Sequence, residues 1–248
     1  MTLTAGTTVT VLAVALLAAG CSSDSAPSTD LTVLAASSLT DVYDELAQAF
    51  EAAHPDIDVD LQFAGSSRLA SLIEEGAPGH VFASADRRTM QRVVDRGEAA
   101  TDPRPFATNA LTLIVPSGNP ADVSALGDLA RPELLVAQCA VQVPCGAAAA
   151  ELYASIDLVV EADSFEPNVR AVVTKVELGE VDVGVVYRTD ALAASDRVTE
   201  VSIDASWVVN EYSVVTLAGA PAEADRLVAF VLSPEGQAIL AGHGFGAP

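Results

Sequence analysis

The stretch LTVLAASSLTDVYDELAQAF, residues 31–50, contains a short apolar run, a serine pair and then a helical pattern. Residues 31–35 are predicted to form a buried strand, and apolar residues from 39 to 50 recur at three- and four-residue steps, as on one helix face. Ser38 lies at the joint, where it can cap the helix with Asp41 as its capping-box partner. The joint can instead bind an anion, because a first helical turn offers free N–H groups and the positive end of a dipole.

The same strand-to-helix joint recurs three times further along the chain. A strand over 57–63 leads through GSS, residues 65–67, into a helix over 68–75. VPCG, residues 143–146, leads into an Ala-rich helix that extends through Tyr153, and Glu166-Pro167-Asn168 opens a helix that ends at Gly179. Further strands are predicted at 81–83, 111–115, 134–137, 181–186 and 213–217, and further helices at 87–96, 222–232 and 234–242.

This alternation predicts an α/β fold with largely parallel sheets, in which ligands bind at the carboxyl ends of the strands. All four joints are expected on that side. The 248 residues, 50% of them hydrophobic, suffice for one large domain or two lobes. The net charge of -22 argues against nucleic acid as a partner and against charge-driven adhesion to an anionic membrane. An anion site would therefore need local donors.

The N-terminus has the features of an export signal. VTVLAVALLAA, residues 9–19, is too short to span a bilayer and ends in small residues. LLAAGC, residues 16–21, resembles a lipobox, which predicts a signal peptide over 1–20, a lipid on Cys21 and a flexible tether over 21–30. The protein is then exported and anchored to the outer face of the cell membrane. The alternatives are that the apolar run is an anchor that is not cleaved, or that the start of the protein is misassigned.

The two remaining cysteines, Cys139 and Cys145, are expected to form a disulfide in an oxidising compartment, or else to be two buried thiols. No further ligands are spaced nearby for a zinc site. The chain contains no G-x-S-x-G, H-E-x-x-H or P-loop motif, so an enzyme is not expected.

Five segments, taken in order, resemble the molybdate-binding component of bacterial ABC transporters, a type II periplasmic-binding-protein family. The resemblance extends from about Leu31 to Phe245. The segments are AASSLTDVYDELAQAF (35–50), FAGSSRLASLIEEGAPGHVFASAD (63–86), VPCGAAAAEL (143–152), PNVRAVV with GEVDVGVVYRTDA (167–173 and 179–191) and FVLSPEGQAILAGHGF (230–245).

The resemblance implies that a monomer binds molybdate or tungstate as an oxyanion, with neither a cofactor nor a metal cation, and passes it to an ABC permease. The implied contacts are the hydroxyls of Ser38, Ser66 and Tyr187 and the backbone N–H groups of Cys145 and Val169. Ser37 is a further possible donor, and Arg68 and Arg170 either pair with the anion or with nearby carboxylates. Another tetrahedral oxyanion, such as sulfate or phosphate, is an alternative ligand, and an oxyanion-sensing lipoprotein is an alternative role.

The resemblance also implies two lobes, each a mostly parallel sheet flanked by helices, joined by two crossovers. The expected division is residues 31–110 plus 213–248 for the first lobe and 111–212 for the second.

Overall fold

The structure is a computed structural model that describes residues 1–2 and 28–248. The predicted signal peptide, Cys21 and most of the tether lie outside the described residues. Among the residues that are described, no helix has the length and apolar character needed to cross a membrane.

Nine strands form one connected sheet in the order β2-β1-β3-β9-β4-β7-β5-β6, with β8 paired to β4. Their bounds are β1 Thr29–Ala36, β2 Ile57–Ala64, β3 Val81–Ser84, β4 Arg104–Pro116, β5 Val136–Cys139, β6 Ser164–Glu166, β7 Val183–Tyr187, β8 Val198–Val201 and β9 Val209–Thr216. The outer strands of each half are parallel: β2, β1 and β3 on one side, and β7, β5 and β6 on the other. The antiparallel pairs all involve β4 or β9.

Eight α-helices and two 3-10 helices are assigned in the described part of the chain. They are η1 Ser37–Leu39, α1 Thr40–Ala53, α2 Ser66–Glu74, α3 Arg87–Asp95, η2 Leu126–Ala130, α4 Pro144–Ser155, α5 Val169–Glu177, α6 Arg188–Ala193, α7 Ala222–Val231 and α8 Pro234–Gly242.

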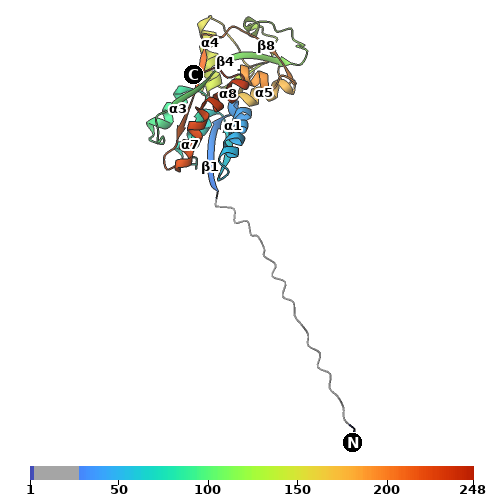
Figure 1. The fold of residues 1–248 in the computed structure, drawn as a ribbon. Coiled ribbons are helices and arrows are strands. Elements are labelled where there is room, and N and C mark those ends of the chain that lie inside the picture. Colours follow the sequence, from blue (N-terminus) through green and yellow to red (C-terminus); the bar gives the residue numbers. More distant parts are fainter. Residues whose placement is uncertain (3–27) are drawn as a thin grey trace.

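The elements form two lobes (Figure 1). One lobe contains β1, α1, α3 and α7, and the other contains α4, α5 and β8. The hydrophobic core follows the same division, because one buried cluster is drawn from residues 111–208 alone. Two other clusters are drawn from residues 31–107 and 212–245.

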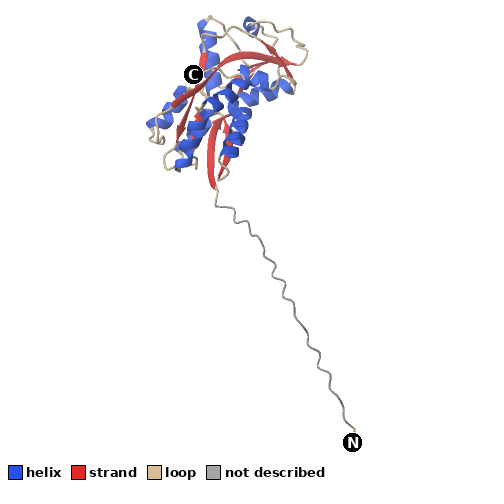
Figure 2. Ribbon diagram, viewed as in Figure 1, coloured by secondary structure: helices blue, strands red, loops and turns tan. Residues whose placement is uncertain are grey.

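The long strand β4 connects the two lobes (Figure 2). Its residues up to Ala110 pair with β9, whereas those from Leu111 onward pair with β7 and β8. Strand β9 begins at Val209, four residues before the predicted crossing at Ser213. The residue boundaries of the lobes stay a prediction.

The predicted strands and helices are present, with ends that differ by a few residues. Sequence patterns missed the first half of β4, where polar and apolar residues mix, and the short elements β6, β8 and α6. The capping prediction for Ser38 was wrong. Ser38 lies inside η1, no side chain of the described residues caps α1, and its hydroxyl contacts Tyr212 instead.

Candidate functional site

One cavity is lined by all five residues that the sequence singled out: Ser38, Ser66, Cys145, Val169 and Tyr187. The first two come from one lobe and the other three from the second. The free volume of this cavity is about 10 Å³, so the lobes leave little empty space there. Of the described residues that line it, none has a carboxylate or a cationic side chain. Its lining is therefore neutral and able to donate hydrogen bonds.

Three helices begin at this cavity, which explains the source of its donors. Ser66 is the first residue of α2, Val169 is the first residue of α5, and Cys145 follows Pro144 at the start of α4. The N–H groups of a first helical turn have no partner inside their own helix, and the dipole places partial positive charge there. Asn168 occupies one such group in α5, since its Oδ1 accepts from Ala171 N–H at 3.0 Å. The N–H groups nearer the start of α5 keep their capacity to bind an anion.

The Ser66 hydroxyl is held in a donating orientation. Its Oγ accepts a hydrogen bond from Ala85 N–H at 3.1 Å, so its own proton is available to the cavity. Ser66 is 1% exposed, so this hydroxyl has little access to bulk water.

The Tyr187 hydroxyl is buried and has no hydrogen-bond partner among the described residues. Burial, with smaller effects from Tyr212, Asp86 and Asp190, raises the pKa of Tyr187 well above its ordinary value. The phenol therefore stays protonated and able to donate. A buried donor without a partner costs about 1–3 kcal/mol, a cost that an oxyanion in the cavity would remove.

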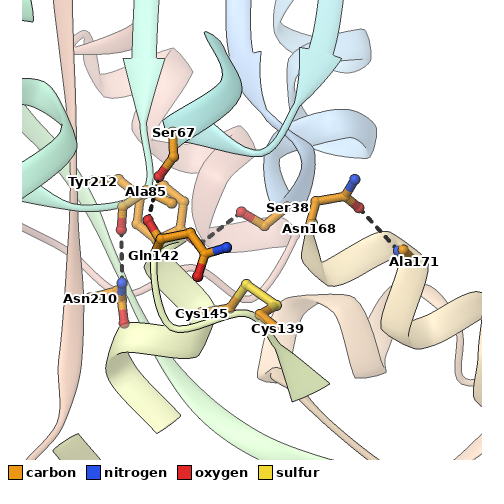
Figure 3. Close-up of a disulfide and its surroundings, with 10 residues drawn as sticks. All are labelled: Ser38, Ser67, Ala85, Cys139, Gln142, Cys145, Asn168, Ala171, Asn210 and Tyr212. Carbon is orange, nitrogen blue, oxygen red and sulfur yellow. Dashed lines mark hydrogen bonds between the residues drawn. A yellow bond between two sulfur atoms is a disulfide. The ribbon is translucent and has the colours of Figure 1, made fainter. Parts of the chain in front are cut away.

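The disulfide prediction is confirmed, because Cys139 and Cys145 are bonded at an S–S distance of 2.04 Å (Figure 3). The bridge connects the end of β5 to the first turn of α4. It closes a short loop in which a Cβ on Gly146 would lie 2.1 Å from Ala140 O. The loop that carries Cys145, which lines the cavity, is thus covalently and sterically constrained.

The two lobes contact each other on both sides of the cavity. On one side, Ser67 Oγ and Arg88 Nη2 donate to Gln142 O at 2.7 and 3.2 Å (the Ser67 bond is visible in Figure 3). Gly65 also approaches the second lobe, because a Cβ built on it would lie 2.5 Å from Pro167 O. The structure therefore shows the lobes closed around the cavity.

On the other side, Arg170 makes the contact between the lobes. Its guanidinium forms an ion pair with Asp41, donates to Ser37 O at 3.3 Å and lies 3.5 Å from the Asp190 carboxylate. Of the two alternatives for Arg170, the structure supports pairing with nearby carboxylates. Arg68 is exposed and does not line the cavity, whereas Ser37 does line it.

Asp190 is a fully buried carboxylate beside this contact. Burial raises its pKa to about 7, although Arg170 and the Tyr187 backbone act to lower it. Within residues 1–2 and 28–248, no group of His, Cys, Asp and Glu side chains could hold a metal cation.

The residues behind the cavity were not predicted from the sequence. Tyr212 in β9 contacts Ser38, and Asn109 in β4 contacts both Tyr212 and Thr189. Ser38 and Tyr212 are 174 positions apart. The one local signal was the presence of polar residues within otherwise buried strands.

Comparisons with known proteins find relatives over most of the chain. The family of bacterial extracellular solute-binding proteins matches residues 31–246. The molybdate-binding protein ModA of Mycobacterium tuberculosis H37Rv is 38% identical over 88% of this chain and 85% of its own length. The putative ABC transporter substrate-binding lipoprotein YvgL of Bacillus subtilis 168 is 31% identical over 94% of both chains. The solved periplasmic molybdate-binding protein of Azotobacter vinelandii is 21% identical, with a TM-score of 0.77, over 88% of this chain and 99% of that one, a likeness of fold.

Proposed function

We propose that this chain, which belongs to the family of bacterial extracellular solute-binding proteins, captures molybdate or tungstate between its lobes and delivers it to the permease of an ABC transporter. The relatives named above support the ligand class, since one is a molybdate-binding protein and another is a putative ABC transporter lipoprotein. Its role is binding and transport without turnover.

The observation that carries the proposal is that every proposed contact can donate a hydrogen bond and that no carboxylate lines the cavity. The proposed contacts are the hydroxyls of Ser38, Ser66 and Tyr187 and the N–H groups of Cys145 and Val169. The cavity residues include no carboxylate that could accept a ligand proton. A fully deprotonated dianion uses every one of these donors, whereas a protonated anion leaves its own proton unpaired.

This chemistry separates molybdate from phosphate. Phosphate near neutral pH carries at least one proton, and burying an unmatched polar group costs about 1–3 kcal/mol. That cost is about one to two powers of ten in affinity. Sulfate has the right charge but shorter bonds, so only the fit of the closed lobes can disfavour it.

Isothermal titration calorimetry with molybdate, tungstate, sulfate and phosphate tests the proposal. We expect one site, with molybdate and tungstate bound tightest and phosphate at least roughly tenfold weaker. Phosphate binding as tight as molybdate would contradict the argument from a cavity without a carboxylate. Absence of any molybdate heat at all concentrations would contradict the ligand assignment.

Delivery to a permease distinguishes transport from sensing. A permease gene and an ATPase gene beside this one would favour transport, and deletion of the protein should then raise the molybdate concentration needed for growth of a molybdenum-dependent culture. Unchanged growth at limiting molybdate would favour a sensing lipoprotein.

We also propose that the mature protein begins at a lipidated Cys21, which ties it to the outer face of the membrane. The lipobox-like LLAAGC and the Ser/Pro/Asp tether that follows support this location.

A further inference from the structure

A chain of hydrogen bonds runs to the cavity from β4 and β9, the paired strands at the connection between the lobes, here called the hinge strands. Asn109 lies in β4 and Tyr212 in β9, and both side chains are buried. Asn109 Nδ2 lies 3.4 Å from the Tyr212 hydroxyl, which in turn lies 2.9 Å from Ser38 Oγ. Figure 3 shows the contact between Ser38 and Tyr212. The chain ends at a serine that lines the proposed anion site.

The orientation of the Asn109 amide at the start of this chain is fixed by a backbone group. Asn109 Oδ1 accepts from the N–H of Ala110 at 3.0 Å, and a backbone N–H can only donate. The amide oxygen must therefore face Ala110, and the amide NH₂ must face the other side. That NH₂ donates to Thr189 Oγ1 at 2.7 Å and to the Tyr212 hydroxyl at 3.4 Å.

The orientation of the Asn109 amide influences the direction of the hydroxyl protons of Tyr212 and Ser38. Either oxygen can be the donor in the Tyr212–Ser38 contact. The hydrogen bond that the Tyr212 oxygen accepts from Asn109 polarises its O–H and so favours Tyr212 as the donor to Ser38 Oγ. Burial raises the pKa of Tyr212 above its usual range, so this proton is retained. Ser38 Oγ then accepts from behind, and its own proton faces the cavity that it lines.

We propose that Asn109 and Tyr212 are positioning residues that hold Ser38 as a donor and so bias the site against oxyanions that carry a proton. This rests on the proposed function, because it assumes an oxyanion in the cavity. Ser66 is held in the same way by Ala85 N–H. A proton on a ligand oxygen that faces either serine would have to be accepted by an oxygen that already accepts one hydrogen bond.

The test is Tyr212→Phe, which keeps the ring and removes the hydroxyl. Ser38 is then free to rotate and to accept, so we expect molybdate affinity to fall roughly tenfold. Phosphate affinity should stay the same or rise, so the molybdate-to-phosphate ratio of dissociation constants changes by that factor. Calorimetry at one fixed pH, with each anion alone, measures both constants.

Tyr43→Phe is the matched control. The Tyr43 hydroxyl is buried without a hydrogen-bond partner among the described residues, and its ring contacts Phe106, which also contacts the Tyr212 ring. Tyr43 does not line the cavity. This variant should leave the molybdate-to-phosphate ratio at the wild-type value.

Asn109→Asp provides a second, independent variant. Its carboxylate accepts the Tyr212 proton, so Ser38 must donate to Tyr212 and the cavity loses a donor. We expect a larger loss of molybdate affinity than in Tyr212→Phe, with the ratio again reduced. Equal losses for both anions in either variant, or a ratio the same as in Tyr43→Phe, would overturn the inference. Failure of the wild-type protein to bind molybdate would instead overturn the proposed function.

Discussion

Gly65 lies at the closest approach of the two lobes, and Gly65→Ala tests whether binding requires their closure. Its φ of -59° and ψ of 134° suit any L residue, so alanine introduces no local strain. The obstacle lies across the cavity, since the new Cβ would be 2.5 Å from Pro167 O. A backbone oxygen cannot swing aside as a side chain can, so the lobes themselves must separate.

The size of the effect follows from that distance. The distance of 2.5 Å between the new Cβ and Pro167 O is about 0.9 Å shorter than the 3.4 Å at which ordinary van der Waals contact begins. Hydrogen bonds weaken steeply beyond their normal lengths of about 2.7–3.2 Å, so a separation of this size loses at least one bond from the second lobe. A hydrogen bond to a charged group contributes about 1.5–3 kcal/mol, so molybdate affinity should fall by at least roughly tenfold.

The assay is calorimetric titration of Gly65→Ala with molybdate, beside a melting curve of the ligand-free protein. The ligand-free melting temperature should stay close to wild type, because open lobes do not bring the alanine against Pro167. Gly127→Ala is the matched control, since a Cβ there has no described atom within 4 Å and its affinity should not change. Wild-type molybdate affinity in Gly65→Ala would refute the argument that binding requires the closed lobes.

Four further outcomes are expected. Reducing the Cys139–Cys145 bridge, whose cysteines are six positions apart, should lower the free energy of unfolding by about 2 kcal/mol and the melting temperature by roughly 4–8 °C; a scan with reductant that shows no shift would contradict this. Arg170→Ala removes a half-exposed contact between the lobes, so molybdate affinity should fall by at most about fivefold; complete loss in a titration would show that Arg170 binds the anion. The pKa of Asp190 is about 7 in the folded protein and lower when unfolded, so the folded state holds a proton that the unfolded chain releases. Stability should therefore fall as pH rises from about 4 to about 7, and urea titrations of Asp190→Asn should lack that fall; an unchanged pH profile would exclude the assignment. Cys21→Ala should move the protein from the membrane fraction to the soluble fraction, and unchanged membrane attachment would rule out lipidation.

The sequence predicted the strand-to-helix joints because each joint depends on residues that are close in the chain. Apolar periodicity placed α2, α4 and α5 correctly to within a few residues, and the parallel arrangement then brought their first turns to one cavity. The disulfide could be predicted for a similar reason. Once Cys21 is assigned to the lipid, two cysteines remain, and Cys139 and Cys145 are close in sequence.

Contacts between distant residues could not be predicted in this way. The sequence suggested two partners for the Ser38 hydroxyl, a helix N–H and a ligand. In the structure this hydroxyl contacts Tyr212, which lies in the hinge strand β9. Asp41 likewise pairs with Arg170 across the lobes instead of closing a capping box. The first contact depends on the strand order that brings β9 close to β1 within one lobe, and the second depends on how the two lobes meet. No local pattern specifies either of them.

Native mass spectrometry tests the central claim most directly. The protein is incubated with equal concentrations of molybdate, tungstate, sulfate and phosphate, and the bound anion is identified from its mass. We expect one molybdate or tungstate per chain in the wild type and none in the Ser38→Ala, Ser66→Ala double variant. One bound phosphate or sulfate in the wild type, or molybdate retained by the double variant, would contradict the account.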